Sequence, residues 1–182
     1  STTLDLMPVG AGKSPWPIAV CPTNGFVFFK SRFTNEELEK LRPHVFSDAY
    51  RALSGETPYY RAAWLMERLG EPHEKVTWGL LGASWEAMHD PPRYERYATE
   101  LLVRLPADVA ALQGRDKRLY QMLQGELERR LARFDQARTH FEQFLSTGDL
   151  SADERAVARY QLGLIAARDR GVHFVRDALG EK

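Results

Sequence analysis

The chain has 182 residues, in which 25 Lys and Arg are balanced by 25 Asp and Glu, and it has a single cysteine. This length is sufficient for one domain with a substantial core. The balanced charge removes the broad electrostatic attraction that drives most binding to nucleic acids and anionic membranes, so we expect no nucleic-acid partner. A lone cysteine excludes an intramolecular disulfide and does not distinguish a reducing compartment from an oxidising one.

The apolar runs are too short to cross a membrane. The longest, Ile18–Cys21 and Phe26–Phe29, fall far short of the roughly 20 residues that a membrane-spanning helix requires. The localisation stays unknown. A cytoplasmic location is slightly favoured, and export stays open because a leader ahead of Ser1 would not be visible.

The first 33 residues differ in composition from the rest of the chain. They are rich in helix-breaking residues, namely Gly10, Gly12, Gly25, Pro8, Pro15, Pro17 and Pro22. Two short β-prone runs, Ile18–Cys21 and Phe26–Phe29, flank Asn24-Gly25, the dipeptide best suited to a tight hairpin. We therefore predict an irregular segment with a β-hairpin over residues 1–33 and a helical domain over residues 34–182.

From Thr34 onward the sequence pattern is helical. The capping box Thr34–Glu37 predicts a helix that begins at Asn35. Thr57-Pro58 predicts the start of a second helix, which Gly70 ends. Apolar spacing predicts further helices over residues 73–88, 94–105, 116–131, 134–145 and 151–168, the second of these ending before Pro106. The expected fold class is mainly α.

Two segments resemble tetratricopeptide repeats. Gly125 is followed twelve residues later by Ala137, and Ala137 to Phe141 fits the A-x3-F element of such repeats. Residues 125–145, "GELERRLARFDQARTHFEQFL", thus resemble one repeat, although Gln124 and Glu128 stand where Leu and Tyr are usual and no proline closes the unit. Leu162-Gly163 supplies an element of another, and residues 59–87 are more loosely similar. We predict antiparallel helix pairs of the α-solenoid type.

The order of these parts resembles a bacterial family of unknown function in which CPxCG zinc knuckles precede a tetratricopeptide-like helical domain. The resemblance rests on "TTLDLMP", on "CPTNGF" in place of CPxCG and an aromatic residue, and on "LQGELERRLARFDQARTHFEQFL". It covers most of the chain through short motifs with variable gaps. It implies an earlier CxxC pair upstream of Ser1 and no known activity.

The stretch around Cys21 would be half of a zinc knuckle whose second ligand has become Asn24. Structural zinc needs four ligands, usually in two closely spaced pairs, and an amide oxygen is a poor substitute for a thiolate. The histidines are scattered, at His44, His73, His89, His140 and His173. We therefore predict that Cys21 is a turn or core residue, and a metal ligand only if the knuckle is functional.

Other catalytic motifs are incomplete. Gly10 to Ser14, "GAGKS", resembles a phosphate loop, but Met7 stands where glycine is needed and Pro15 interrupts the helix that should follow. Cys21 as a nucleophile would need a nearby base, and no histidine neighbours it in the sequence. We predict no catalytic residues and no cofactor.

A modest basic cluster near the repeat is the best place in the sequence for an acidic peptide partner. It comprises Arg129, Arg130, Arg133 and Arg138. Glu126, Glu128 and Asp135 interrupt it, so a solvated repeat surface is the more ordinary interpretation.

The sequence favours a non-catalytic scaffold that binds an unidentified protein or peptide, because repeat arrays create extended concave surfaces. An alternative is a metal-binding or redox module in which ligands missing from this chain complete a site with Cys21. An enzyme acting on cell-envelope or small-molecule substrates is a third hypothesis, which a buried cluster of titratable groups would favour. The sequence does not indicate the partner's identity or the oligomeric state.

Overall fold

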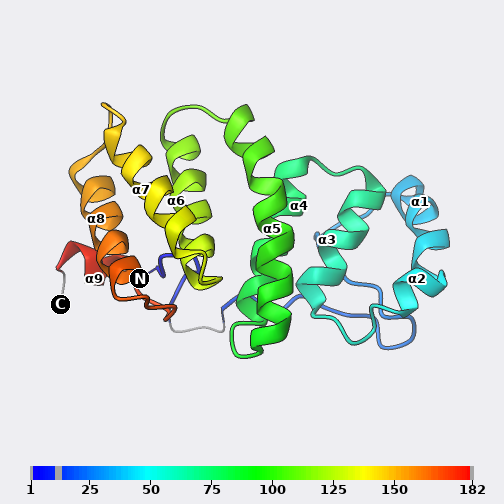
Figure 1. Ribbon diagram of the computed structural model, residues 1–182. Helices are drawn as coiled ribbons and strands as arrows, with labels where there is room; N and C mark the ends of the chain where they lie inside the picture. Colours follow the sequence, from blue (N-terminus) through cyan, green and yellow to red (C-terminus); the bar gives the residue numbers. More distant parts are fainter. Residues whose placement is uncertain (1, 11–13, 181–182) are drawn as a thin grey trace. The chain divides into compact units, whose positions relative to one another are not determined.

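The computed structural model describes residues 2–10 and 14–180, and over these residues the protein is mainly helical. Contacts divide the chain into two compact units, shown in Figure 1. Unit 1 contains Ser1–Ser14 and Leu102–Lys182, and unit 2 contains Pro15–Leu101. The domain boundary that composition predicts, between residues 33 and 34, falls inside unit 2 and stays a prediction.

Unit 2 is built from four helices and the first part of a fifth. These are α1 (Asn35–Val45), α2 (Asp48–Arg51), α3 (Pro58–Leu69), α4 (His73–Glu86) and α5 (Pro91–Ala111), which continues into unit 1. The predicted capping box at the start of α1 is present, with the Glu37 amide donating to the Thr34 hydroxyl at 3.2 Å. As expected, α3 begins at Pro58 and ends at Gly70, which adopts a left-handed φ of 84°.

The core of unit 2 lies where α3 packs against both α1 and α4. One cluster of this core joins the helices to the segment that precedes them, and its buried members are Phe26, Leu41, Val45, Tyr50, Leu65 and Leu69. Burial of these side chains supplies the main driving force for the unit, on the order of 2 kcal/mol for each large apolar side chain. The segment of unit 2 that precedes α1 therefore packs, through Phe26, against the same residues that hold the helices together.

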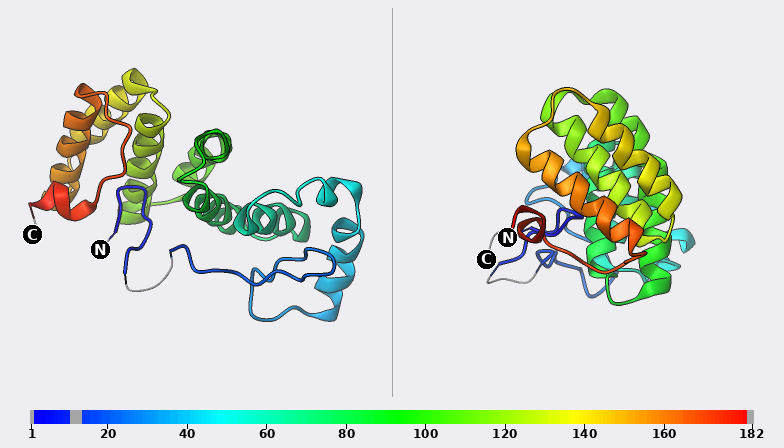
Figure 2. Two further views of the ribbon diagram at one scale, coloured as in Figure 1. Left: turned by 90° about the horizontal axis from the view of Figure 1, so that it is seen from below. Right: turned by 60° about the vertical axis from the view of Figure 1, so that its left-hand side comes forward.

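In unit 1, the end of α5 is followed by α6 (Gly114–Arg130), α7 (Phe134–Ser146), α8 (Ala152–Ala166) and the short α9 (Val175–Leu179). Helix α7 packs against both α6 and α8, and the three lie side by side in Figures 1 and 2. A Cβ atom at Gly125 would lie 2.6 Å from Cε2 of Phe141, so the glycine permits the close approach of α6 and α7.

One sequence-based expectation is corrected here, and another, the β-hairpin, is not confirmed. The prediction that a helix ends before Pro106 is wrong, because α5 runs through this proline to Ala111. A proline inside a helix removes one backbone hydrogen bond, and packing of the flanking turns can outweigh that loss. The described residues contain no strand: the two β-prone runs meet in a single antiparallel bridge, between Val20 and Val27. None of the described helices has the length and apolar character needed to cross a membrane.

Candidate functional site

The stretch around Cys21 forms a tight turn in unit 2. The Cys21 amide donates a hydrogen bond to the Phe26 carbonyl at 2.8 Å, and the Gly25 amide donates one to the Cys21 carbonyl at 2.9 Å. Gly25 has a φ of 72°, a left-handed conformation that favours glycine. The Oδ1 atom of Asn24 accepts a hydrogen bond from the Phe26 amide at 3.0 Å, so the Asn24 side chain stabilises the turn from within.

The backbone around Cys21 favours the ionised form of its thiol. Hydrogen bonds from the backbone amides of Asn24 and Thr23 lower the pKa of this thiol, because they favour the thiolate. Among the described residues, no group of three or more His, Cys, Asp or Glu side chains is placed to hold a metal ion. Partly buried, the thiol packs against the apolar cluster of unit 2 that contains Phe26. Ligands beyond the described residues would have to complete any metal site here.

A hollow surrounds Phe46 beside this turn, and we call it the Phe46 hollow. It consists of two adjoining cavities that share the lining residues Asn24, Val45 and Phe46. The first, the basic cavity, has a volume of about 610 Å³ and is also lined by Thr23, Gly25, Tyr50, Arg51, Ser54 and Arg61. The second, the apolar cavity, has a volume of about 370 Å³ and is also lined by Cys21, Phe26, Phe28, Leu38, Leu41 and Arg42.

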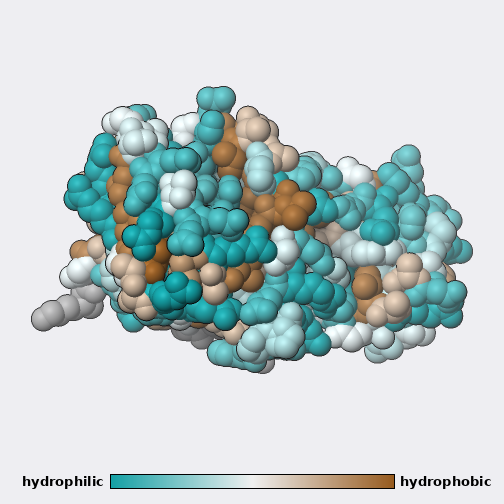
Figure 3. Space-filling view, in the orientation of Figure 1, coloured by the Kyte–Doolittle hydropathy of each residue, from teal (hydrophilic) through white to brown (hydrophobic). Residues whose placement is uncertain are grey.

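The rim of the apolar cavity exposes three large apolar side chains. Phe46 is 61% exposed, Phe28 is 47% exposed and Leu38 is 42% exposed. Single exposed apolar residues are ordinary, but several that gather around one hollow are typical of a surface that binds a partner. The space-filling view shows apolar patches set among hydrophilic residues on the visible face of each unit (Figure 3).

Arg61, on α3, reaches the turn from inside unit 2. Its side chain is 9% exposed, and Nη1 donates to the Gly25 carbonyl at 3.1 Å. The same carbonyl accepts the Tyr50 hydroxyl at 2.8 Å. Burial raises the pKa of Tyr50 to about 12, so this hydroxyl stays protonated as a donor. The turn is thus held at one carbonyl by two donors from different helices.

The basic cluster predicted near the repeat is not a single surface patch. Arg129 is fully buried and Arg130 is 6% exposed, whereas Arg133 and Arg138 are exposed. The four positions follow one another at the end of α6 and along α7, but helical geometry turns the first two inward. Only the latter two stay accessible to an acidic peptide.

Arg129 and Arg130 belong to a buried ionic network that closes the interior of unit 1. Arg129 donates from Nη2 to Glu126 Oε1 at 2.8 Å and from Nε to Gln161 Oε1 at 3.0 Å. Arg130 donates from Nη1 to Asp5 Oδ2 at 2.8 Å. Burial raises the pKa of Glu126 to about 7, against the opposing effect of the Arg129 charge.

This network fastens both end segments of unit 1 to its helices. Arg129 also donates to the carbonyls of Asp169 and Gly171, the latter at 2.8 Å. The N-terminal segment is hydrogen-bonded in turn to the C-terminal one, the Leu4 amide to the His173 carbonyl at 2.9 Å. A buried cluster of titratable groups is the feature that would favour an enzyme, and this network is such a cluster. Each of its arginines is paired with a carboxylate, however, as expected of a structural network.

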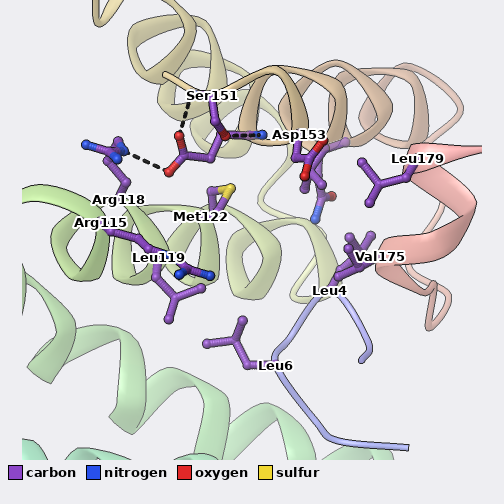
Figure 4. Close-up of a pocket in the computed structure, with 13 residues that line it drawn as sticks. Leu4, Leu6, Arg115, Arg118, Leu119, Met122, Ser151, Asp153, Val175 and Leu179 are labelled. Atoms are coloured by element: carbon purple, nitrogen blue, oxygen red, sulfur yellow. Dashed lines mark hydrogen bonds and ion pairs between the residues drawn. The ribbon is translucent and has the colours of Figure 1, made fainter. Parts of the chain in front are cut away.

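A further cavity, of about 500 Å³, lies within unit 1 (Figure 4). Its apolar walls are Leu4, Leu6, Leu119, Met122, Val157, Val175 and Leu179. Its charged residues are two arginines and two carboxylates, and Arg118 is paired with Glu154, Nε to Oε1 at 2.7 Å. The cavity therefore offers apolar volume without a net charge that would select a ligand.

The phosphate-loop resemblance falls largely outside the described residues, since only Gly10 and Ser14 of "GAGKS" are described. Sequence reasoning did not identify Arg61. The sequence feature that could have indicated its burial is its position directly before Ala62 and Ala63, within an otherwise apolar helix face. An arginine at a core position is unusual unless it is paired.

Comparison with known proteins yields no match: no family model, no curated protein and no solved structure is similar to this chain. The resemblance to knuckle-bearing tetratricopeptide-like proteins therefore stays a hypothesis based on its short motifs.

Proposed function

We propose that the protein is a non-catalytic scaffold that binds a peptide segment of another protein in the Phe46 hollow. The observation that carries this proposal is the gathering of exposed Phe28, Leu38 and Phe46 around a cavity of about 370 Å³. Aromatic side chains at a concave apolar surface are typical anchors of protein interfaces. The hollow is supported from below by the core cluster of unit 2, so its walls are fixed before a ligand binds.

The helical part of the proposal is that consecutive helices form tetratricopeptide-like antiparallel pairs. Its support is the packing of α7 against both α6 and α8, together with the close approach at Gly125. On this view the degenerate knuckle is a hairpin-like turn that kept its shape after losing a ligand. Asn24 and Gly25 stabilise the turn, and packing on the core replaces a metal ion.

The alternative, a metal-binding or redox module, has one observation in its favour: the lowered pKa of the Cys21 thiol. A thiolate is the form that binds metal or reacts. Zinc content, measured on the full-length protein and on Cys21→Ser, tests this alternative. One equivalent of zinc that is lost in the variant would establish the metal site.

A displayed library of random peptides, selected on the intact protein, tests peptide binding. We expect selected peptides to lose at least tenfold in affinity when Phe46→Ser and Leu38→Ser are introduced together. The matched control is Val103→Ser, because Val103 is a 78% exposed apolar residue of unit 1 that lies outside the hollow. Failure to select any peptide, or equal affinity for both variants, would overturn the proposal.

A further inference from the structure

Arg61 is a buried cation that contacts no carboxylate directly among the residues that the structure describes. Its one hydrogen bond goes to the Gly25 carbonyl, and the Nε–H group, although buried, has no partner in the described chain. No described carboxylate forms an ion pair with it. An isolated buried charge is strongly destabilising unless a partner compensates it. Burial raises the pKa of the Glu86 carboxylate and the charge of Arg61 opposes that rise, but no ion pair joins these two described side chains, so the fold leaves a buried N–H donor of Arg61 unsatisfied.

The surroundings of Arg61 favour an anionic ligand. Among the described residues, no Asp or Glu lines either cavity of the Phe46 hollow. The two other arginines that line it, Arg42 and Arg51, have exposed side chains with their own carboxylates, Glu39 at 3.6 Å and Asp48 at 2.9 Å. Arg61, whose Nε–H donor has no partner in the described part of the chain, remains at the wall of a cavity of about 610 Å³.

The amount of charge distinguishes between two kinds of anion. A carboxylate carries one negative charge and accepts hydrogen bonds from a guanidinium in a planar, forked geometry. A phosphate group carries close to two charges and is usually held by several cations. Because Arg42 and Arg51 have their own carboxylates, Arg61 alone is left to hold the anion, which matches a carboxylate.

We propose that Arg61 binds a carboxylate of the peptide that occupies the Phe46 hollow, while a neighbouring apolar side chain of the same peptide fills the apolar cavity. This inference rests on the proposed function. The two cavities share Asn24, Val45 and Phe46, and alternate residues of an extended peptide point to the same side, about 6.6 Å apart. Two residues at positions i and i+2 of one peptide can therefore reach both cavities, and the occupant is a segment with an acidic group two residues from a large apolar one.

Calorimetric titration of the intact protein with a peptide selected from the library tests the proposal. The selected peptide is compared with analogues in which each Asp becomes Asn, each Glu becomes Gln, or the C-terminal carboxylate becomes an amide. Neutralising one particular carboxylate is expected to lower the affinity about tenfold or more, the size of a charge-assisted hydrogen bond. Arg61→Gln should show the same loss and be insensitive to that analogue.

Two further variants complete the design. Arg138→Gln, an exposed arginine of unit 1, should bind every peptide as the wild type does. Arg61→Lys keeps the charge but not the planar fork, and should bind with intermediate affinity. Because Arg61 also contacts Gly25, circular dichroism checks that each variant is folded, and the analogue series on the wild type needs no variant.

The outcomes separate the two proposals. If every neutralised analogue binds as tightly as the parent while substitution of Phe46 and Leu38 abolishes binding, the peptide site stands and the role of Arg61 is wrong. Displacement of the peptide by millimolar inorganic phosphate would equally overturn the carboxylate assignment. If no peptide depends on Phe46 and Leu38, the proposed function fails, and the inference about Arg61 fails with it.

Discussion

The two units of the protein each bury arginine side chains, but they treat the charge differently. In unit 1, Arg129 and Arg130 are paired with Glu126 and Asp5 at 2.8 Å each. In unit 2, Arg61 is buried with only a backbone carbonyl as partner among the described residues. A buried charge that the fold pairs directly supports the fold, whereas a buried guanidinium with an unsatisfied donor beside a cavity indicates a binding role.

The largest expected effect is the loss of the Arg129 side chain. Arg129→Met would leave Glu126 buried without its partner and remove the hydrogen bonds to Gln161 and the C-terminal segment. We expect a loss of about 3–5 kcal/mol in the free energy of unfolding, measured by urea denaturation. Arg138→Met, on an exposed face of α7, should change stability by no more than about 0.5 kcal/mol. Equal effects of the two substitutions would contradict a structural role for the network.

The second effect is a pH dependence that originates at Glu126. Its pKa is raised from 4.5 to about 7 in the folded protein, so the folded state binds this proton more tightly than the unfolded state. The stabilising contribution is therefore complete below pH 4.5 and is lost as the pH rises to about 7, a change on the order of 3 kcal/mol.

Glu126→Gln removes this titration and serves as the reference. We expect the wild type to lose stability relative to Glu126→Gln between pH 4.5 and pH 7.5, as determined by urea denaturation across that range. A gain relative to the variant would show instead that the Arg129 charge dominates and that the carboxyl is ionised throughout.

A third test measures how tightly the interior of unit 1 is closed. Gly125→Ala would place a Cβ atom 2.6 Å from the fully buried ring of Phe141, and we expect a loss of about 1–3 kcal/mol. Gly163→Ala is the matched control on α8, where no neighbouring atom lies within 4 Å. Since alanine favours helix over glycine, the control should gain up to about 1 kcal/mol. Thermal unfolding of both variants would show whether α6 and α7 are in close contact there.

The smallest expected change in the free energy of unfolding is that of Arg61→Met, which compares the buried arginine of unit 2 directly with those of unit 1. Arg61→Met removes one hydrogen bond to Gly25, whose carbonyl keeps the Tyr50 hydroxyl as donor, and it also removes a buried charge that no ion pair within the described chain holds. We expect a cost of about 1 kcal/mol or less in urea denaturation without ligand. A loss as large as that of Arg129→Met would make Arg61 a structural residue and remove the argument for an anionic ligand.

Local sequence signals determined the start and end of several helices. The capping boxes at Thr34 and Ser151 mark the starts of α1 and α8, and Gly70 ends α3, because these residues satisfy backbone groups within one turn of the chain. The mainly helical fold class follows from the same local rules together with the spacing of apolar residues. The prediction at Pro106 is wrong because the free-energy cost of a proline inside a helix is offset by contacts that the spacing of residues in the sequence does not reveal.

The tertiary structure alone decided which charged residues are buried and which of them meet. Arg129, Arg130, Arg133 and Arg138 form one cluster in the sequence, yet only the first two turn toward the interior, where Arg130 meets Asp5, 125 positions away. Arg61 reaches the Gly25 turn across 36 positions. Charge pairing depends on distance in space, whereas the sequence specifies distance along the chain. For the same reason, the residues that line the Phe46 hollow, which come from separate segments of the chain, are brought together only in the folded protein.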